Sequence, residues 1–421
     1  MSIETVERMG KPKFHIDDIL EYIIIFAVII SSSSIWVQED AYMLDGSIVK
    51  LFIVGLCMVW LLISRKSLDL ILSRYDVAAF LVIILAVFLY TVTHMGWIIE
   101  AYLNAFIPTV VFSVMFMVSR RNGRADAMAT KFVNVMTIMG LESLIFYFLI
   151  NYTQLLTPTG YIKIKWSWLK FVPSYYNIYY DPMPGRLYRH GFTRNCAIFP
   201  EAPMFCYLLC LAIMINELCI IKRSRIKSAI LFIAIFSTVS TTGYYFLILL
   251  YVYKYISSNW HRMKLTKLML IPAILFAAYS YVIESWNKKM GTSSFSVRRD
   301  HVFACIKCFF NTNGIGCGIG NADYVLKFMT RKNGISCGLP YIFAQGGVFW
   351  GFMFVIPILI TIFVMIKKKK FNNMFACVLL TFILFLTACH NKYDTWFVFA
   401  FVVFANDKFI EGDKKIAVRI K

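Results

Sequence analysis

The sequence predicts an all-α, polytopic integral membrane protein. Hydrophobic residues make up 59% of its 421 positions and charged residues only 16%, whereas soluble globular domains carry about 25% charged residues. Apolar runs of about 20 residues, the length of helix that crosses a bilayer, recur from "ILEYIIIFAVIISSSSIWV" to "LPYIFAQGGVFWGFMFVIPILITIF". We therefore expect residues 1–421 to form one transmembrane domain without a separate soluble domain.

About twelve membrane-spanning helices are expected, with both termini on the cytoplasmic side. The first follows a mostly polar stretch with no compact basic region leading into a small-residue cleavage site, which is typical of an uncleaved signal anchor. The predicted spans lie near residues 19–37, 48–64, 77–95, 98–118, 132–151, 202–221, 227–239, 243–256, 268–284, 340–366, 374–389 and 395–406.

The segment 227–256 has basic residues at both ends, which is typical of two crossings that return to one side. Divided at "STTG", Ser240 to Gly243, it gives two short helices of about 21 Å each at 1.5 Å per residue. We therefore expect a hairpin of short helices. One long helix is the alternative, and it would invert the topology of everything after it.

The formal charge of +20 is explained mainly by topology. Clusters of Lys and Arg follow every second predicted span, as the positive-inside rule requires of cytoplasmic loops. These clusters lie near residues 65–74, 120–131, 222–227, 254–267 and 367–370, and in the tail from residue 408. A nucleic-acid partner is therefore not expected.

Two predicted external loops, 152–201 and 285–339, are also rich in basic residues, against the positive-inside rule. We therefore expect an anionic ligand on the outer face. Aromatic residues in the first loop fit either an interfacial belt or a platform for sugar rings. The basic residues are Lys163, Lys165, Lys170, Arg186, Arg189 and Arg194 in the first loop, and Lys288, Lys289, Arg298, Arg299, Lys307, Lys327, Arg331 and Lys332 in the second.

The predicted spans themselves are nearly free of ionisable residues, whereas channels and secondary transporters place such groups at mid-membrane depth. Glu142 is the main exception. It fits a polar group in helix packing better than a site for a coupling ion.

The glycine-rich stretch "GIGCGIGN", residues 314–321, does not fit a dinucleotide-binding fingerprint, because the third glycine is missing at the required spacing. Its glycines instead predict a tight turn with positive φ. Contact between its backbone amides and a diphosphate is the alternative.

The cysteines give no metal signature. "CIKC", Cys305 to Cys308, has no second pair at zinc-finger spacing, so neither a metal site nor redox chemistry is predicted. A disulfide between Cys317 and Cys337, in the same predicted external loop, is left open by the sequence. No cofactor or metal ion is expected.

Several segments together resemble bacterial O-antigen and capsule polymerases. "RNCAIFPEAPMFCYLL", from Arg194, resembles the family segment in which an arginine precedes a glutamate-proline pair, although Ala202 here separates Glu201 from Pro203. "RRDHVFACIKCFFNTNGIGCGIGN" resembles a later external segment with an arginine, an amphipathic helix and a Gly-x-Gly turn. "YIFAQGGVFWGFMFVI" resembles the entry to the next membrane helix.

The related O-antigen ligases carry a Ser-Arg turn between two helices and a His-Asn pair before a late helix. Here the turn "STVSTTGYYFL" has Thr241 and Thr242, and the late position is Cys337 to Pro340. Both differences favour a polymerase over a ligase. A flippase or other transporter is the third alternative.

The resemblance implies a fold like that of GT-C glycosyltransferases in the bacterial inner membrane, with the active site facing outward. It implies glycosyl transfer from an undecaprenyl-diphosphate-linked repeat unit to the next lipid-linked unit, without metal. A chain-length regulator is a further candidate partner.

The chemistry implied needs guanidinium groups for the departing diphosphate and a proton acceptor for the acceptor hydroxyl. Arg298 and Arg299 are the first candidates for the diphosphate, and Glu201, Asp300 and His301 for proton transfer. His390 is a reserve base. Further candidates for diphosphate or glycan binding are Arg194, Arg189, Arg186, His190, Gly316 and Gly318.

Overall fold

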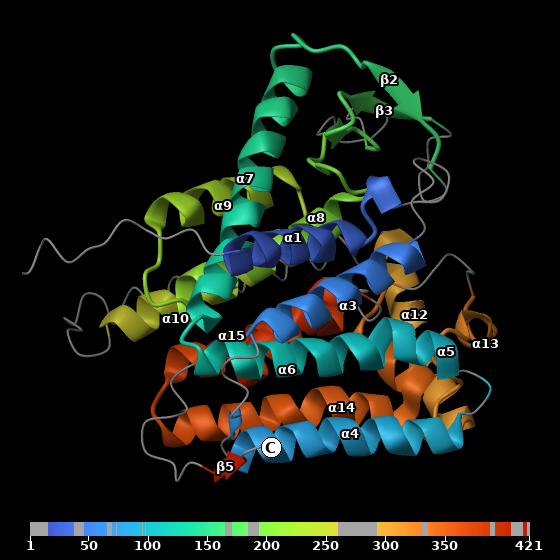
Figure 1. The fold of residues 1–421 in the computed structure, drawn as a ribbon. Helices are drawn as coiled ribbons and strands as arrows, with labels where there is room; N and C mark the ends of the chain where they lie inside the picture. Colours follow the sequence, from blue (N-terminus) through green and yellow to red (C-terminus); the bar gives the residue numbers. More distant parts are fainter. Residues whose placement is uncertain are drawn as a thin grey trace, which may run out of the picture.

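The structure is a computed structural model of the whole chain, and its helices are arranged as a tilted bundle (Figure 1). The residues that it describes are 16–37, 46–64, 70–72, 74–94, 96, 98–164, 171–183, 193–259, 293–330, 336–387, 392–405 and 416–418.

The predicted all-α class is confirmed for this part of the chain. The helices are α1 (Ile16–Ser31), α3 (Gly46–Ile63), α4 (Arg74–Thr93), α5 (Ile98–Ala101), α6 (Ile107–Arg121), α7 (Ala125–Asn151), α8 (Ala202–Met214), α9 (Arg225–Ser237), α10 (Thr241–Asn259), α12 (Ser293–Asn311), α13 (Ala322–Leu326), α14 (Leu339–Lys367), α15 (Phe371–Leu386) and α16 (Tyr393–Phe404). Short π-helical segments follow α5 and α8, at Tyr102–Phe106 and Ile215–Cys219, and a 3-10 turn spans Ile35–Val37.

Two small antiparallel sheets, which the sequence did not predict, accompany the helices. Strand β1 (Leu70–Leu72) pairs with β5 (Ile416–Val418). In the predicted first external loop, β3 (Val172–Tyr175) lies between β2 (Gly160–Ile162) and β4 (Tyr179–Tyr180). Strands this short carry too few residues for an alternating pattern to stand out in a sequence.

Six described helices are long and apolar enough to cross a bilayer. They are Gly46–Ile63, Arg74–Thr93, Ile99–Arg121, Ala125–Asn151, Ala202–Cys219 and Leu339–Lys367, and Phe371–Leu386 and Tyr393–Phe404 are shorter apolar helices. Eleven of the twelve predicted spans coincide with helices in the structure, whereas the one near 268–284 lies outside the described residues. The count of twelve crossings and the side on which each loop lies remain predictions.

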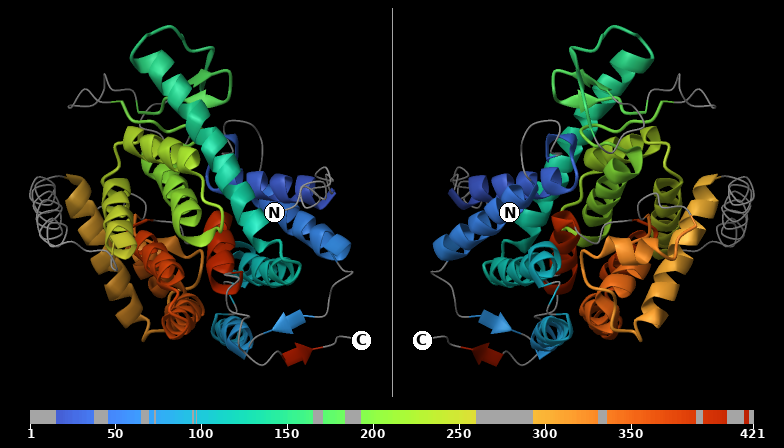
Figure 2. Two further views of the ribbon diagram at one scale, coloured as in Figure 1. Left: turned by 90° about the vertical axis from the view of Figure 1, so that its left-hand side faces the viewer. Right: turned by 90° about the vertical axis from the view of Figure 1, so that its right-hand side faces the viewer.

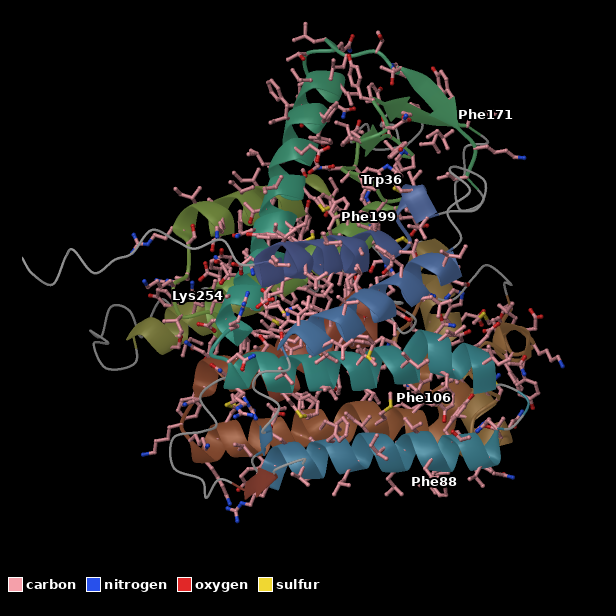
Figure 3. All side chains as sticks on the ribbon, in the orientation of Figure 1. Trp36, Phe88, Phe106, Phe171, Phe199 and Lys254 are labelled. Atoms are coloured by element: carbon pink, nitrogen blue, oxygen red, sulfur yellow. The ribbon has the colours of Figure 1, made fainter. Side chains whose placement is uncertain are left out.

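Apolar side chains cover much of the outer surface of the bundle, as a bilayer-facing surface requires. On α4, Leu81 and Phe88 are 60% and 63% exposed, and Figure 3 shows Phe88 projecting outward. Phe106, by contrast, is buried inside the bundle. Exposed apolar patches of this extent are rare on soluble monomers.

The centre of the bundle is formed by α8 and α16, in which almost every residue is buried. Phe112 and Phe116 of α6 meet Phe397 of α16 edge to face, with ring centroids 5.5 and 4.9 Å apart. Around this centre, α4 lies alongside α14, as Figure 1 shows, and α6 packs against α16. A helix that is apolar on all sides is expected at such a buried position.

The predicted division of 227–256 into two helices is confirmed, because α9 and α10 are separate helices. The break lies at residues 238–240, slightly before the predicted meeting point at Ser240 to Gly243. Helix α9 begins after Ser224, whose side chain caps the N–H of Lys227, and it ends at Ser237. The chain turns through Thr238 to Ser240, with Val239 at a φ of 48°. In the two views of Figure 2, α9 lies against α7.

The glycine-rich stretch forms the predicted tight turn after α12. Gly314, Gly316, Gly318 and Gly320 all have positive φ, between 76° and 101°. A Cβ atom added to Gly316 would collide with the Gln345 carbonyl oxygen. The turn therefore docks closely against a break in α14 at Gly347, where φ is 59°.

Candidate functional site

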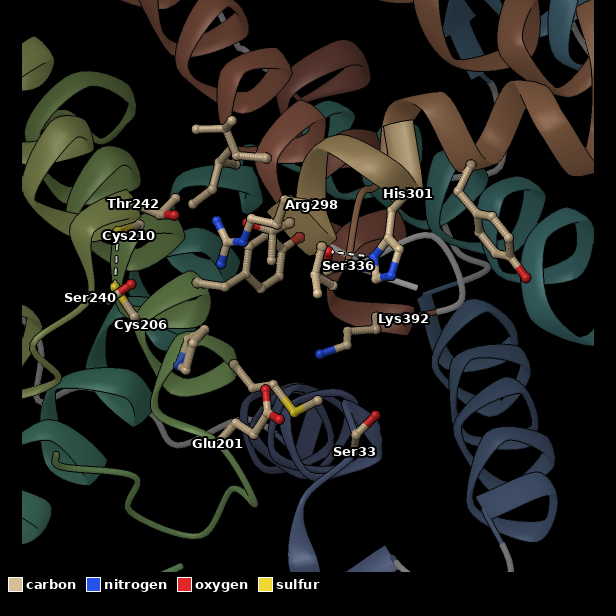
Figure 4. Close-up of a pocket in the computed structure, with 18 of the residues that line it drawn as sticks. Ser33, Glu201, Cys206, Cys210, Ser240, Thr242, Arg298, His301, Ser336 and Lys392 are labelled. Carbon is tan, nitrogen blue, oxygen red and sulfur yellow. Dashed lines mark hydrogen bonds between the residues drawn. The ribbon is translucent and has the colours of Figure 1, made fainter. Parts of the chain in front are cut away.

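A cavity of about 540 Å³ opens among α8, α12, α15 and the segments that precede α14 and α16. Volumes of this size are typical of ligand sites, which range over roughly 300–1,000 Å³. Figure 4 shows that polar side chains from several helices converge on it. The polar and ionisable residues that line it are Ser31, Ser33, Lys50, Glu201, Cys206, Tyr207, Cys210, Ser240, Thr242, Arg298, His301, Ser336, Tyr341, Thr387 and Lys392.

Glu201 and Arg298, which lie in two different predicted external loops, both line this cavity. Glu201 is the N-cap residue of α8, with extended backbone angles, and its side chain does not cap the helix. Pro203 fits the first turn of α8, where an N–H has no helical acceptor. The start of α8 therefore leaves the Glu201 carboxyl directed toward the cavity (Figure 4).

The charges of this region favour an anion. Burial lowers the pKa of the Arg298 guanidinium, the nearby positive charge of Arg194 acts in the same direction, and Glu201 opposes both. Arginine nevertheless stays protonated in proteins. Arg194 does not line the cavity, but Arg298, Lys50 and Lys392 do, whereas Glu201 is the acidic residue of the lining. The lining therefore carries excess positive charge, which an anionic ligand would balance.

Arg194 also connects this wall to the helix hairpin. Its Nε donates a hydrogen bond to the carbonyl oxygen of Thr238, 3.0 Å away, in the turn between α9 and α10. The side chain of the next residue, Asn195, donates to the hydroxyl groups of Ser143 and Ser237. Ser240 and Thr242, which follow the same turn, line the cavity.

His301 lies one helical turn after Arg298 and lines the same cavity. Its side chain is almost completely buried, with 1% of the residue exposed. Nδ1 accepts the backbone N–H of Ser336 at 3.1 Å and lies 2.8 Å from the Ser336 hydroxyl, as Figure 4 shows. Because a backbone N–H only donates, Nδ1 carries the lone pair and the neutral ring bears its proton on Nε2.

This arrangement holds His301 neutral. Burial lowers the pKa of the imidazole and Arg298 acts in the same direction, whereas Asp300 raises it. Nε2 is buried without a hydrogen-bond partner among the described residues. A neutral ring protonated on Nε2 offers a hydrogen-bond donor, not a proton acceptor, so the geometry suits ligand binding better than general-base catalysis.

Two lysines that were not predicted from the sequence also line the cavity. Lys392, just before α16, is only 8% exposed, and its ammonium group extends into the same space as the Arg298 guanidinium (Figure 4). Lys50, in the first turns of α3, donates to the Asn104 side chain over 2.6 Å. Both sit at predicted external helix ends, so a positive-inside test of every helix end would have identified them.

Arg299 and Asp300, predicted to act beside Arg298, are placed differently. Successive helical residues are about 100° apart around the axis. Arg299 is accordingly exposed and does not line the cavity. The Asp300 carboxylate accepts the backbone N–H and the hydroxyl of Thr330, at 2.8 and 2.9 Å, which assigns it a role in holding α12 to the segment after α13.

Gly316 and Gly318, the candidates for the alternative of diphosphate contact, do not line the cavity. The Gly316 N–H donates to the hydroxyl of Thr312 at 3.1 Å, and the Gly318 N–H to the carbonyl of Gln345 at 2.8 Å. Because both amides have protein acceptors, the geometry favours the turn over an anion cradle. Four other predicted residues lie outside the described residues, namely Arg186, Arg189, His190 and His390.

Within the described residues, no group of three or more His, Cys, Asp or Glu side chains is arranged to hold a metal ion. The chain matches no protein-family model and no curated protein. Its function is therefore inferred from the cavity itself, which combines cationic groups, a carboxyl group and a buried hydrogen-bond donor.

Proposed function

We propose that the protein polymerises lipid-linked oligosaccharide repeat units into a surface polysaccharide, O-antigen or capsule, in the bacterial inner membrane. The observation that carries the proposal is the meeting of Glu201 and Arg298 in one cavity with excess positive charge. These residues come from the two segments that resemble the polymerase family. In this proposal the cavity faces outward and receives an undecaprenyl-diphosphate-linked glycan.

The reaction is a glycosyl transfer with a diphosphate leaving group. A hydroxyl oxygen of the acceptor repeat unit attacks the anomeric carbon of the donor and forms the new glycosidic bond. The bond from that carbon to the diphosphate oxygen breaks, and both of its electrons leave with the lipid diphosphate. Glu201 accepts the proton of the attacking hydroxyl and later releases it to solvent.

The basic residues stabilise the leaving group. The planar Arg298 guanidinium binds phosphate oxygens in a bidentate manner, and the Lys392 ammonium adds a second positive charge in the same cavity. As negative charge builds up on the diphosphate, fixed positive groups in a partly buried site stabilise it more strongly than water does. His301 donates from Nε2 to a phosphate or sugar oxygen.

The first test is the surface polysaccharide of the source bacterium after deletion of the gene. The strain is complemented with the wild type, with Arg298→Ala, or with Arg299→Ala as a matched control, at equal membrane levels. We expect a single repeat unit on the anchor after deletion, and a ladder of longer chains restored by the wild type and Arg299→Ala only.

Two outcomes would overturn the proposal. Long polymer that is made but not attached to its anchor would indicate a ligase. An unchanged ladder after deletion would indicate that another protein polymerises the units. A direct assay removes dependence on the cell: purified protein in lipid nanodiscs receives lipid-linked repeat units extracted from the deletion strain, and chain growth is followed by mass spectrometry.

A further inference from the structure

Four cysteines gather beside the cavity, in the segment that the sequence places in the second external loop. Cys305 and Cys308 lie one turn apart on α12, so both are on the same face of that helix. Cys317 lies in the glycine turn and Cys337 directly precedes α14. Cys305, Cys308 and Cys337 are at most 4% exposed, and Cys317 is partly exposed.

Two of the four thiols are in contact, and the other two belong to residues that share one hydrogen-bond acceptor. The Sγ atoms of Cys305 and Cys337 are 3.5 Å apart. Cys308 and Cys317 converge on one carbonyl oxygen, that of Ala344, which accepts the Cys308 thiol at 3.5 Å and the Cys317 backbone N–H at 3.0 Å. The Cys317 thiol donates to the carbonyl oxygens of Asn321 and Gly318, at 3.5 and 3.9 Å, within the same turn.

We propose that Cys305 bonds to Cys337 and Cys308 to Cys317 as two disulfides in the mature protein. The inference rests on the outward orientation given under the proposed function, because disulfides form and persist on the oxidising side of the membrane. For each bond, two thiols lose two protons and two electrons to a protein disulfide donor, which is reduced to a dithiol.

This pairing differs from the one that the sequence leaves open. A bond between Cys317 and Cys337 would require Cys337 to leave the Cys305 thiol that it contacts on α12. A bond within "CIKC" would have to form inside the continuous helix α12, where Cys305 already faces Cys337. The structure therefore connects α12 to two other segments and not to itself.

The bonds would fix the wall of the candidate site. Cys337 follows Ser336, whose N–H holds the His301 imidazole, and α12 carries Arg298 and His301 into the cavity. The Cys305 to Cys337 bond would hold these two parts of the wall together. The second bond would hold α12 to the glycine turn.

Differential alkylation tests the inference without reference to activity. Membranes are denatured in the presence of N-ethylmaleimide, which labels the free thiols. The disulfides are then reduced, and the thiols released are labelled with a heavier maleimide. Peptide mass spectrometry identifies the label on each cysteine. We expect the heavy label on all four cysteines and the light label on Cys377 of α15, which serves as an internal control. Light label on all four in the wild type would overturn the proposal.

Single substitutions test the pairing. In Cys305→Ser, Cys337 should be the one remaining cysteine of the four that changes from the heavy to the light label. In Cys308→Ser, Cys317 should be the one that changes. If Cys305→Ser instead releases Cys308, the bond lies within "CIKC", and the proposed pairing is wrong. The thiol state is measured whether or not polymer forms, so the two proposals can fail separately. Heavy label on all four cysteines, together with a normal polysaccharide ladder in Arg298→Ala, would refute the proposed function and support the disulfides.

Discussion

His301 accepts a hydrogen bond from the backbone N–H of Ser336 through Nδ1, over 3.1 Å. This bond requires a neutral ring, because a protonated Nδ1 would face another donor. It joins α12 to the segment before α14, at the wall of the cavity. The protonation state of a single histidine is therefore linked to the position of two cavity-forming segments.

The linkage predicts a loss of stability at acidic pH. The pKa of His301 is lowered in the folded state, so between that value and the ordinary value of about 6.5 the unfolded chain binds the extra proton. The contribution of His301 to the free energy of unfolding is then fully present above about pH 6.5, and it is lost as the pH falls toward the pKa of His301 in the folded protein. We expect thermal unfolding of the purified protein to show this fall, and His301→Gln to show a smaller one. An equal fall in both would contradict the assignment.

Arg298 and Arg299 give a matched pair of neighbouring arginines. Arg298 lines the cavity, whereas Arg299 is exposed on another side of α12. Removing a group that stabilises developing charge costs roughly 100-fold in rate. We expect this loss of chain growth in nanodiscs for Arg298→Ala, a smaller loss for Arg298→Lys, and near-normal rates for Arg299→Ala. Equal losses for the two alanine variants would show that general charge, not the cavity, is responsible.

Glu201 is predicted to accept the proton of the acceptor hydroxyl. Glu201→Gln keeps the size of the side chain but removes its basicity, and loss of a general base lowers rates by roughly 100-fold or more. We expect kcat for chain growth to fall while the KM for the lipid-linked unit changes little. Glu142→Gln, on α7 and outside the cavity lining, is the control. A change in KM alone would assign Glu201 to binding.

Much of this arrangement could be predicted from sequence patterns that are local. The hairpin followed from charge at both ends of 227–256, and the turn after α12 from glycines that adopt positive φ. Arg298 could not be separated from Arg299, because the rotation of α12 is set by its packing against α14. Lys392 and the cysteine pairs depend equally on tertiary contacts, which no spacing in the sequence encodes.

A buried ion pair joins the start of α4 to the end of α6, and we expect its loss to lower stability strongly. Arg120 donates to both carboxylate oxygens of Asp76, at 3.1 and 2.5 Å, and both side chains are almost fully buried. Removing one partner of such a pair leaves a buried charge and costs about 3–5 kcal/mol. We expect Asp76→Asn to lower the free energy of unfolding by this amount in denaturant titrations of purified protein.

Two further variants separate the ion pair from general effects of charge. Asp17 pairs with Arg124, and both side chains are about one-quarter exposed. Asp17→Asn should therefore lower the free energy of unfolding by roughly 1 kcal/mol or less. Asp76→Leu combined with Arg120→Met should recover much of the loss, because well-packed apolar residues often replace a buried pair without cost. If Asp76→Asn is as mild as Asp17→Asn, water or another anionic group reaches Arg120, and the pair does not hold α4 to α6.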